Sequence, residues 1–194
     1  MRESIGEPWQ QVLWQTVQHH KNADSLRDAA LRGHLGDWTR ALTDVVVTAC
    51  RAMGWQVAAK GHPLDLFPES RHEYLSMDVM AFAQEQRRWQ FPVAVMELEN
   101  SRDDDRIAYS LWKVLCVRAD LRIVFCYRRS PDQSSALIRF LCQEVISAMS
   151  LEERVKLEGE TLVVVGSRDE SATFPYGFFK WWQLETNTGT FQVI

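Results

Sequence analysis

Three carboxylates in the middle of the sequence have the types and the spacing for binding a metal ion. Asp78 lies within one strand-like segment, and Glu97 and Glu99 close the next one. Carboxylates that pack together repel one another, so a fold keeps them only if they are solvated, protonated or neutralised by a cation. Hard cations such as Mg²⁺ prefer oxygen ligands. The residue types therefore indicate a site for a divalent cation, with a solvated acidic rim of a sheet as the alternative.

A β-hairpin is predicted to position these carboxylates. Residues 74–83 and 91–98 are rich in β-branched and apolar side chains, which is typical of strands. Residues 84–90 between them are polar enough to form the connection. Two strands joined by such a short connection are expected to be antiparallel neighbours.

The register of this hairpin decides whether the carboxylates meet. If the connection folds symmetrically about the bond between Arg87 and Arg88, Asp78 lies opposite Glu97, with the two side chains on one face. Side chains alternate along a strand, so Glu99 projects to the same face as Glu97. We therefore predict three converging carboxylates; a slip of one residue would instead separate Asp78 from Glu97.

This arrangement resembles a known nuclease family. An aspartate on one strand, an acidic-x-(lysine or acidic) triplet closing the next strand, and then a helix and a further strand are similar to the PD-(D/E)xK nuclease superfamily, over roughly residues 37–127. The resemblance implies the restriction-endonuclease fold, with Asp78 as the motif aspartate, Glu97 as the second metal-binding carboxylate and Glu99 in the usual lysine position. Some restriction enzymes carry glutamate there and remain active, so an active nuclease and a degenerate relative both stay open.

A lysine could also come from the helix predicted over residues 101–117, for which Ser101 is the candidate N-cap. Lys113 lies at the edge of the apolar stripe of this helix, which is expected to face the sheet. In some branches of the superfamily the catalytic lysine lies on this helix, so the resemblance makes Lys113 a candidate catalytic residue. The preferred alternative is a lysine whose charged end remains in solvent.

The charge and the cysteines restrict the class of protein. The formal net charge is −4, and the basic residues are scattered apart from small groups such as Arg128–Arg129. Proteins that grip long stretches of DNA are usually basic, so bound cations would have to offset part of this charge. The four cysteines lack zinc-ligand spacing and are predicted to be buried thiols in a reducing cytoplasm. Because no apolar run is long enough for a membrane span and the N-terminus lacks a signal peptide, we expect a cytoplasmic protein that makes no membrane contact.

Helical and strand-like periodicities alternate along the rest of the chain. Helices are predicted over residues 8–20, from 24 or 25 onward, over 37–53 and over 130–149, and strands over 55–60, 121–127, 160–165 and 173–183. The core order is α-β-β-β-α-β with additions at both ends, which predicts one α/β domain over residues 1–194. The resemblance implies that this domain is a restriction-endonuclease-like mixed β-sheet flanked by helices.

Two further features have alternative interpretations. Asp44, on the helix predicted over residues 37–53, is a candidate fourth acidic residue of the site, although the polar flank of an exposed helix is preferred. The aromatic segment 174–182 could stack nucleobases, but such a segment more often belongs to a core or a subunit interface.

Two functions from different classes fit these observations. The first is a metal-dependent nuclease, an endonuclease or an exonuclease acting on DNA. In it Asp78, Glu97 and Glu99 bind Mg²⁺ or Mn²⁺, and Glu99 or Lys113 orients or activates the attacking water. The second is a catalytically inactive domain of the same fold that binds a protein partner, or a second copy as a homodimer, through its aromatic C-terminal segment.

Overall fold

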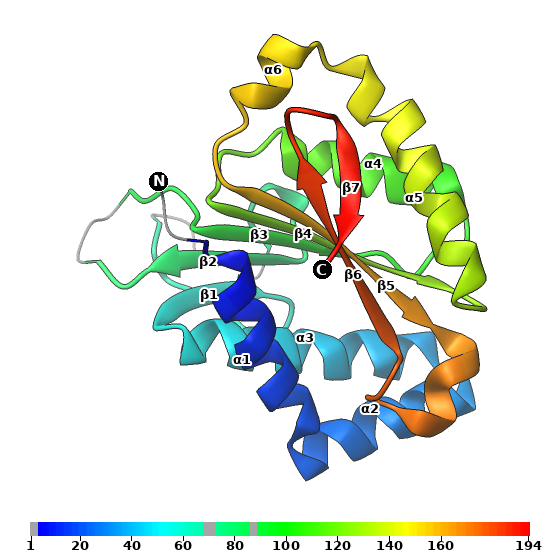
Figure 1. Ribbon diagram of the computed structural model, residues 1–194. Helices are drawn as coiled ribbons and strands as arrows, with labels where there is room; N and C mark the ends of the chain where they lie inside the picture. The colour runs from blue at the N-terminus through cyan, green and yellow to red at the C-terminus, as the bar shows by residue number, and fades with distance from the viewer. Residues whose placement is uncertain (1–3, 68–72, 86–88) are drawn as a thin grey trace.

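The computed structural model describes residues 4–67, 73–85 and 89–194, which form a mixed β-sheet with helices on both faces (Figure 1). The order of the seven strands across the sheet is β1 (Trp55–Ala59), β2 (Val79–Ala83), β3 (Ala94–Leu98), β4 (Leu121–Arg128), β5 (Glu160–Ser167), β6 (Phe179–Glu185) and β7 (Thr190–Val193). The central strands β3, β4 and β5 are parallel, and the other neighbouring pairs are antiparallel. The predicted α/β class and mixed sheet are confirmed.

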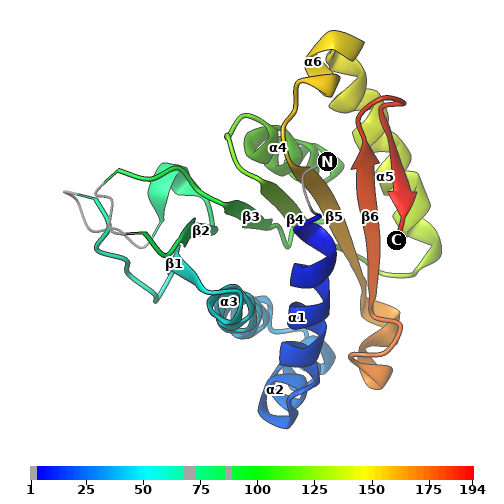
Figure 2. The same ribbon diagram turned by 60° about the vertical axis from the view of Figure 1, so that its left-hand side comes forward.

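Three helices cover one face of the sheet (Figure 2): α1 (Gly6–Gln18), α2 (His20–Arg32) and α3 (Leu35–Ala52). The apolar residues predicted to face inward are buried, among them Trp9 of α1 and Trp38 of α3. Two helix starts were predicted too late. The helix α2 begins directly after His19, whose backbone is extended, and α3 begins after His34 rather than at Asp37.

The other face is covered by α4 (Asp104–Leu115) and α5 (Asp132–Glu144), with the short α6 (Leu151–Val155) beyond them (Figure 1). Three apolar residues of α4, Ile107, Leu111 and Val114, are fully buried against the sheet, as the helical spacing predicted. The predicted N-cap is wrong, because Asp103 and not Ser101 caps the helix: the Asp103 side chain accepts a hydrogen bond of 3.0 Å from the Asp105 amide.

Several predicted strands are shorter than expected, and β3 begins at Ala94 rather than at residue 91. β2 begins at Val79 because residues Tyr74–Ser76 form a 3₁₀ turn instead of extended chain. β6 begins at Phe179, after a 3₁₀ helix over Arg168–Thr173. Phe178 and much of the surrounding aromatic segment are buried in the core, which favours the structural interpretation of that segment over base stacking.

The four cysteines differ in their exposure to solvent. Cys50 and Cys126 are buried and Cys142 is half-buried, but Cys116 is exposed, so the prediction of four buried thiols is wrong at this position. Cys116 is the C-cap residue of α4. In the described ranges, no helix combines the length and the apolar character needed to cross a membrane.

Candidate active site

The register of the central hairpin brings Asp78 and Glu97 together. β2 and β3 pair with Val79 opposite Met96 and Met80 opposite Val95. Asp78 immediately precedes β2, and extending this pairing by one residue places it opposite Glu97, as the symmetric connection predicted. Residues 86–88, which include the middle of the connection, lie outside the described residues.

Two hydrogen bonds hold the Asp78 and Glu97 side chains across the hairpin. The Leu98 amide donates to Asp78 Oδ2 at 2.7 Å, and the Asp78 amide donates to Glu97 Oε1 at 3.4 Å. Each carboxylate is therefore bound to the backbone of the opposite segment. These contacts hold two acidic side chains next to each other at this end of the strands.

Lys113 reaches this pair from α4. Its Nζ lies 2.7 Å from Glu97 Oε2 and donates a second hydrogen bond of 2.8 Å to the carbonyl oxygen of Ser76. Only 20% of the Lys113 side chain is exposed, and 7% of the Glu97 side chain. The preferred interpretation of Lys113 as a solvent-directed lysine is therefore wrong: the ammonium group is turned inward, against the carboxylate pair.

Burial governs the electrostatics of Glu97. Loss of solvent is the largest cause that raises the pKa of Glu97, to about 7; the hydrogen bond from Lys113 opposes this rise and the charge of Asp78 adds to it. Even with the lysine in contact, the carboxylate is poorly stabilised in its charged form. Additional positive charge next to Asp78 and Glu97 would relieve this, which is the electrostatic condition for cation binding.

The segment before Asp78 has an unusual backbone that serves this contact. Leu75 and Ser76 have φ angles of 53° and 55°, in the left-handed region that non-glycine residues seldom adopt. This turn directs the Ser76 carbonyl toward Lys113 and returns the chain to β2. Strain of this kind is found where the surrounding structure requires one geometry, and here it positions the lysine.

Glu99 is held apart from the pair. Its carboxylate accepts a hydrogen bond of 2.6 Å from the Ser101 amide, while its own amide donates to the Phe125 carbonyl of β4. Throughout the described ranges, no three His, Cys, Asp or Glu side chains are grouped as a ready metal site. The structure thus brings together two of the three predicted carboxylates, with the lysine of α4 beside them.

Asp44 lies near the same edge but has its own partner. Asp44 Oδ1 is 2.8 Å from His62 Nε2, and both residues line a pocket of about 540 Å³ that also contains Asp78. The pocket opens on the α3 side of the pair. Sequence reasoning missed His62 because it follows a turn, where no periodicity indicates which residues it will meet.

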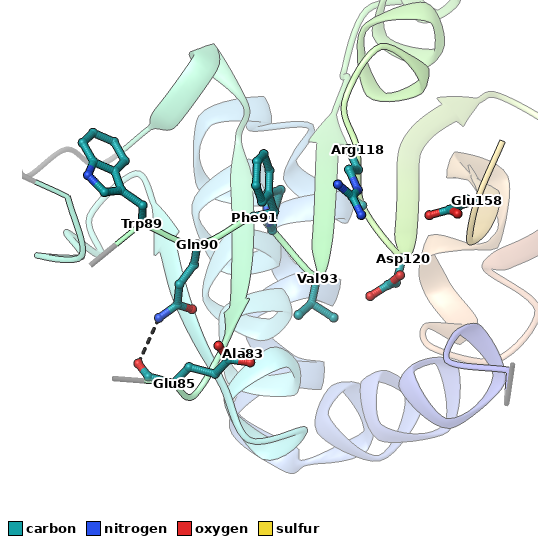
Figure 3. Close-up of a pocket in the computed structure, with 11 residues that line it drawn as sticks. Ala83, Glu85, Trp89, Gln90, Phe91, Val93, Arg118, Asp120 and Glu158 are labelled. Carbon is teal, nitrogen blue, oxygen red and sulfur yellow. Dashed lines mark hydrogen bonds between the residues drawn. The ribbon is translucent and has the colours of Figure 1, made fainter. Parts of the chain in front are cut away.

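The opposite edge of the sheet carries a different pocket, of about 440 Å³, beside the starts of β3 and β4 (Figure 3). Its wall includes the Arg118 guanidinium, 5.5 Å from the centre of the Phe91 ring, and the carboxylates of Asp120 and Glu158. At the rim, Gln90 Nε2 donates a hydrogen bond of 2.9 Å to the carbonyl oxygen of Glu85. This pocket is separated from Asp78 and Glu97 by the length of the strands, so it is not part of the same site.

In comparisons with known proteins, no protein-family model and no curated protein matches the chain. The functional argument therefore rests on the site itself.

Proposed function

We propose that the chain is a metal-dependent nuclease with a restriction-endonuclease-like fold, acting on DNA. The observation that supports this most strongly is the contact between Lys113 and the Asp78–Glu97 pair. A phosphodiester cleavage site of the PD-(D/E)xK type requires two carboxylates and a positive charge, and here the helix α4 supplies the charge that the position of Glu99 lacks.

The two carboxylates fit a small divalent cation. Mg²⁺ is commonly held by one or two carboxylates together with waters and substrate phosphates, so Asp78 and Glu97 suffice as the protein contribution. A bound Mg²⁺ or Mn²⁺ supplies polarisation of the scissile phosphate and a lower pKa for a bound water. Glu99 is the candidate third ligand; its Oε1 already accepts a hydrogen bond from the Ser101 amide, so Oε2 is the oxygen it would offer the cation.

Lys113 supplies the positive charge of the site. Lys113 stabilises the negative charge that develops on the phosphate oxygens, because its ammonium group is held in place by Glu97 and by the Ser76 carbonyl. The strained turn and the buried position of Glu97 keep this geometry without reorganisation when the substrate binds.

The experiment measures cleavage of single-stranded, double-stranded and branched DNA with Mg²⁺ and with Mn²⁺. Asp78→Asn and Glu97→Gln are expected to abolish cleavage, and Asp78→Asn to weaken Mn²⁺ binding in calorimetry. The matched control is Asp28→Asn, an exposed aspartate of α2 that pairs with Arg32. Wild-type protein that cleaves none of these substrates with either metal would refute the proposal.

A second function is favoured by one specific feature of the same surface. Lys113 already neutralises Glu97, and next to it Tyr109 and Trp112 stack on each other while 59% and 53% exposed. An inactive domain of this fold could use the aromatic pair to bind a protein partner or a second copy of the chain. This alternative expects no metal-dependent cleavage, and a change in sedimentation coefficient or partner binding in Trp112→Ala.

A further inference from the structure

A separate cleft at the same end of the central strands has four arginines among its ten lining residues. It encloses about 680 Å³ beyond the ends of β4 and β5, and its charged lining residues are Arg102, Arg128, Arg129, Arg168, Asp104 and Asp169. The guanidinium groups outnumber the carboxylates by two, in a chain whose formal net charge is −4. Positive charge is therefore concentrated at this place against the overall balance of the protein.

The fold itself delivers these arginines from distant parts of the sequence. The parallel strands β3, β4 and β5 end side by side; Arg102 follows β3, Arg128 ends β4 and Arg168 follows β5. The Asp169 amide donates a hydrogen bond of 2.9 Å to the Arg129 carbonyl, which ties the ends of β4 and β5 together. In open α/β sheets, ligands bind at the carboxyl ends of parallel strands.

Two of the four arginines of the cleft contact a carboxylate. Arg128 pairs with Asp104, and Arg129 lies 3.7 Å from Asp169. Among the described residues, Arg102 and Arg168 form no ion pair with a carboxylate.

The surroundings of Arg168 leave its positive charge poorly stabilised. Its guanidinium lies 5.5 Å from the centre of the Tyr127 ring. Burial lowers the pKa of Arg168, the electrostatic interaction with Tyr127 opposes this, and the positive charge of Arg102 lowers it further. Two like charges brought close together in a cleft are stabilised by an anion between them.

The cleft and the candidate active site lie at the same end of neighbouring strands, because Leu98 of β3 pairs with Phe125 of β4 and β4 continues to Arg128. Glu97 lies in β3 and Glu99 directly follows the end of this strand, while Asp104 and Arg128 line the arginine cleft. A strand of nucleic acid bound at Asp78 and Glu97 could therefore continue into the arginines.

We propose that the arginine cleft binds a phosphate group of the substrate strand, next to the phosphate that is cleaved. The identity of the ligand rests on the proposed nuclease function. The planar guanidinium group matches the oxygens of a phosphate and can donate two parallel hydrogen bonds to it. Binding here needs no metal ion, because the arginines supply the positive charge.

The test measures binding without catalysis. A single-stranded DNA oligonucleotide with a fluorescent label at its 3′ end is titrated with protein in EDTA, and fluorescence polarisation gives the affinity. We expect Arg102→Ala and Arg168→Ala each to weaken binding about tenfold, the scale of one charge-assisted hydrogen bond. Each is also expected to reduce the slope of log affinity against log salt by about 1.

The control removes the same charge elsewhere. Arg51 is exposed in the last turn of α3. This turn leads into the start of β1, at the opposite end of the strands from the cleft. Arg51→Ala should bind the oligonucleotide like the wild type. Equal losses in all three variants, or wild-type affinity in Arg102→Ala, would overturn the proposal. Arg102 is exposed, so its variant is expected to stay folded, and thermal unfolding checks both cleft variants.

The source of the phosphate is found by comparing 5′-phosphorylated with 5′-hydroxyl oligonucleotides. A terminal-phosphate site predicts tighter binding of the phosphorylated form, and this difference should be lost in Arg168→Ala. An internal phosphodiester site predicts equal affinities for the two oligonucleotides, and both affinities should fall in Arg168→Ala.

The proposals for the cleft and for the nuclease function can be refuted independently. Loss of binding in the arginine variants without any cleavage by the wild type refutes only the nuclease. Cleavage that depends on Asp78, with unchanged binding by the arginine variants, refutes only the cleft.

Discussion

Replacing Glu97 by glutamine should remove a pH dependence of stability that originates at this one buried carboxyl. The pKa of Glu97 is raised from its ordinary value of 4.5 to about 7, with burial as the main cause. At 1.36 kcal/mol for each pKa unit, the shift corresponds to about 3 kcal/mol, and we expect about 2 to 3 kcal/mol once the side chain relaxes toward solvent.

The sign follows from proton binding. Between pH 4.5 and about 7 the folded protein holds a proton on Glu97 that the unfolded chain has released. The contribution of this group to the free energy of unfolding is therefore fully present below pH 4.5 and is lost as the pH rises through 7. Glutamine resembles the protonated side chain at every pH, so Glu97→Gln should gain stability relative to the wild type across this window.

The assay is urea unfolding of both proteins at several pH values from 4.5 to 8, in EDTA, because the difference between the two curves cancels the other titrating groups. The exposed Glu152 of α6 provides a control for a carboxylate-to-amide change, as Glu152→Gln. In Lys113→Met, the pH range over which stability depends on Glu97 should extend to higher pH, since the hydrogen bond and the charge that lower the pKa of Glu97 are removed. A difference between wild type and Glu97→Gln that does not change with pH would refute the electrostatic account of the site.

Further tests follow from the lysine and from the backbone. Lys113→Ala should reduce the rate of DNA cleavage by about 10² or more, and Glu99→Lys added to it should restore part of the activity; an unaffected Lys113→Ala enzyme would exclude the lysine from catalysis. Leu75→Asn should stabilise the protein by up to about 1 kcal/mol in urea unfolding, because asparagine tolerates the φ of 53° and the leucine side chain is 71% exposed. Gly159→Ala should cost about 2 kcal/mol or more, since a Cβ there would lie 2.3 Å from the carbonyl oxygen of Asp120 at a φ of +81°; a wild-type midpoint would contradict this.

The sequence by itself determined the pairing of Asp78 with Glu97. A polar connection between two apolar strands leaves few registers, and the one symmetric about the connection pairs Asp78 with Glu97; the apolar pattern alone does not select it, because both faces of each strand are buried. The observed pairs of β2 and β3 follow the symmetric register. The buried face of α4 was also determined locally, because helical spacing alone aligns Ile107, Leu111 and Val114.

Only the tertiary structure decided which charges meet. Lys113 lies at the edge of the apolar stripe of α4, so a small change in how the helix crosses β3 would direct it to solvent; the Ser76 carbonyl and Glu97 hold it inward. Strand alternation predicted that Glu99 projects toward the pair; β3 ends at Leu98, and one oxygen of Glu99 accepts a hydrogen bond from the Ser101 amide. A local hydrogen bond to the backbone competed with the predicted cluster.

The arginine cleft was beyond the reach of sequence patterns for the same reason. Arg102, Arg128 and Arg168 come from three separate strand ends, and the sequence indicated only the group at Arg128 and Arg129. Their meeting depends on the parallel order of β3, β4 and β5, which places the three strand ends at one edge. Periodicity describes which face of an element is buried, whereas the contacts between charged ends depend on how the elements are arranged in space.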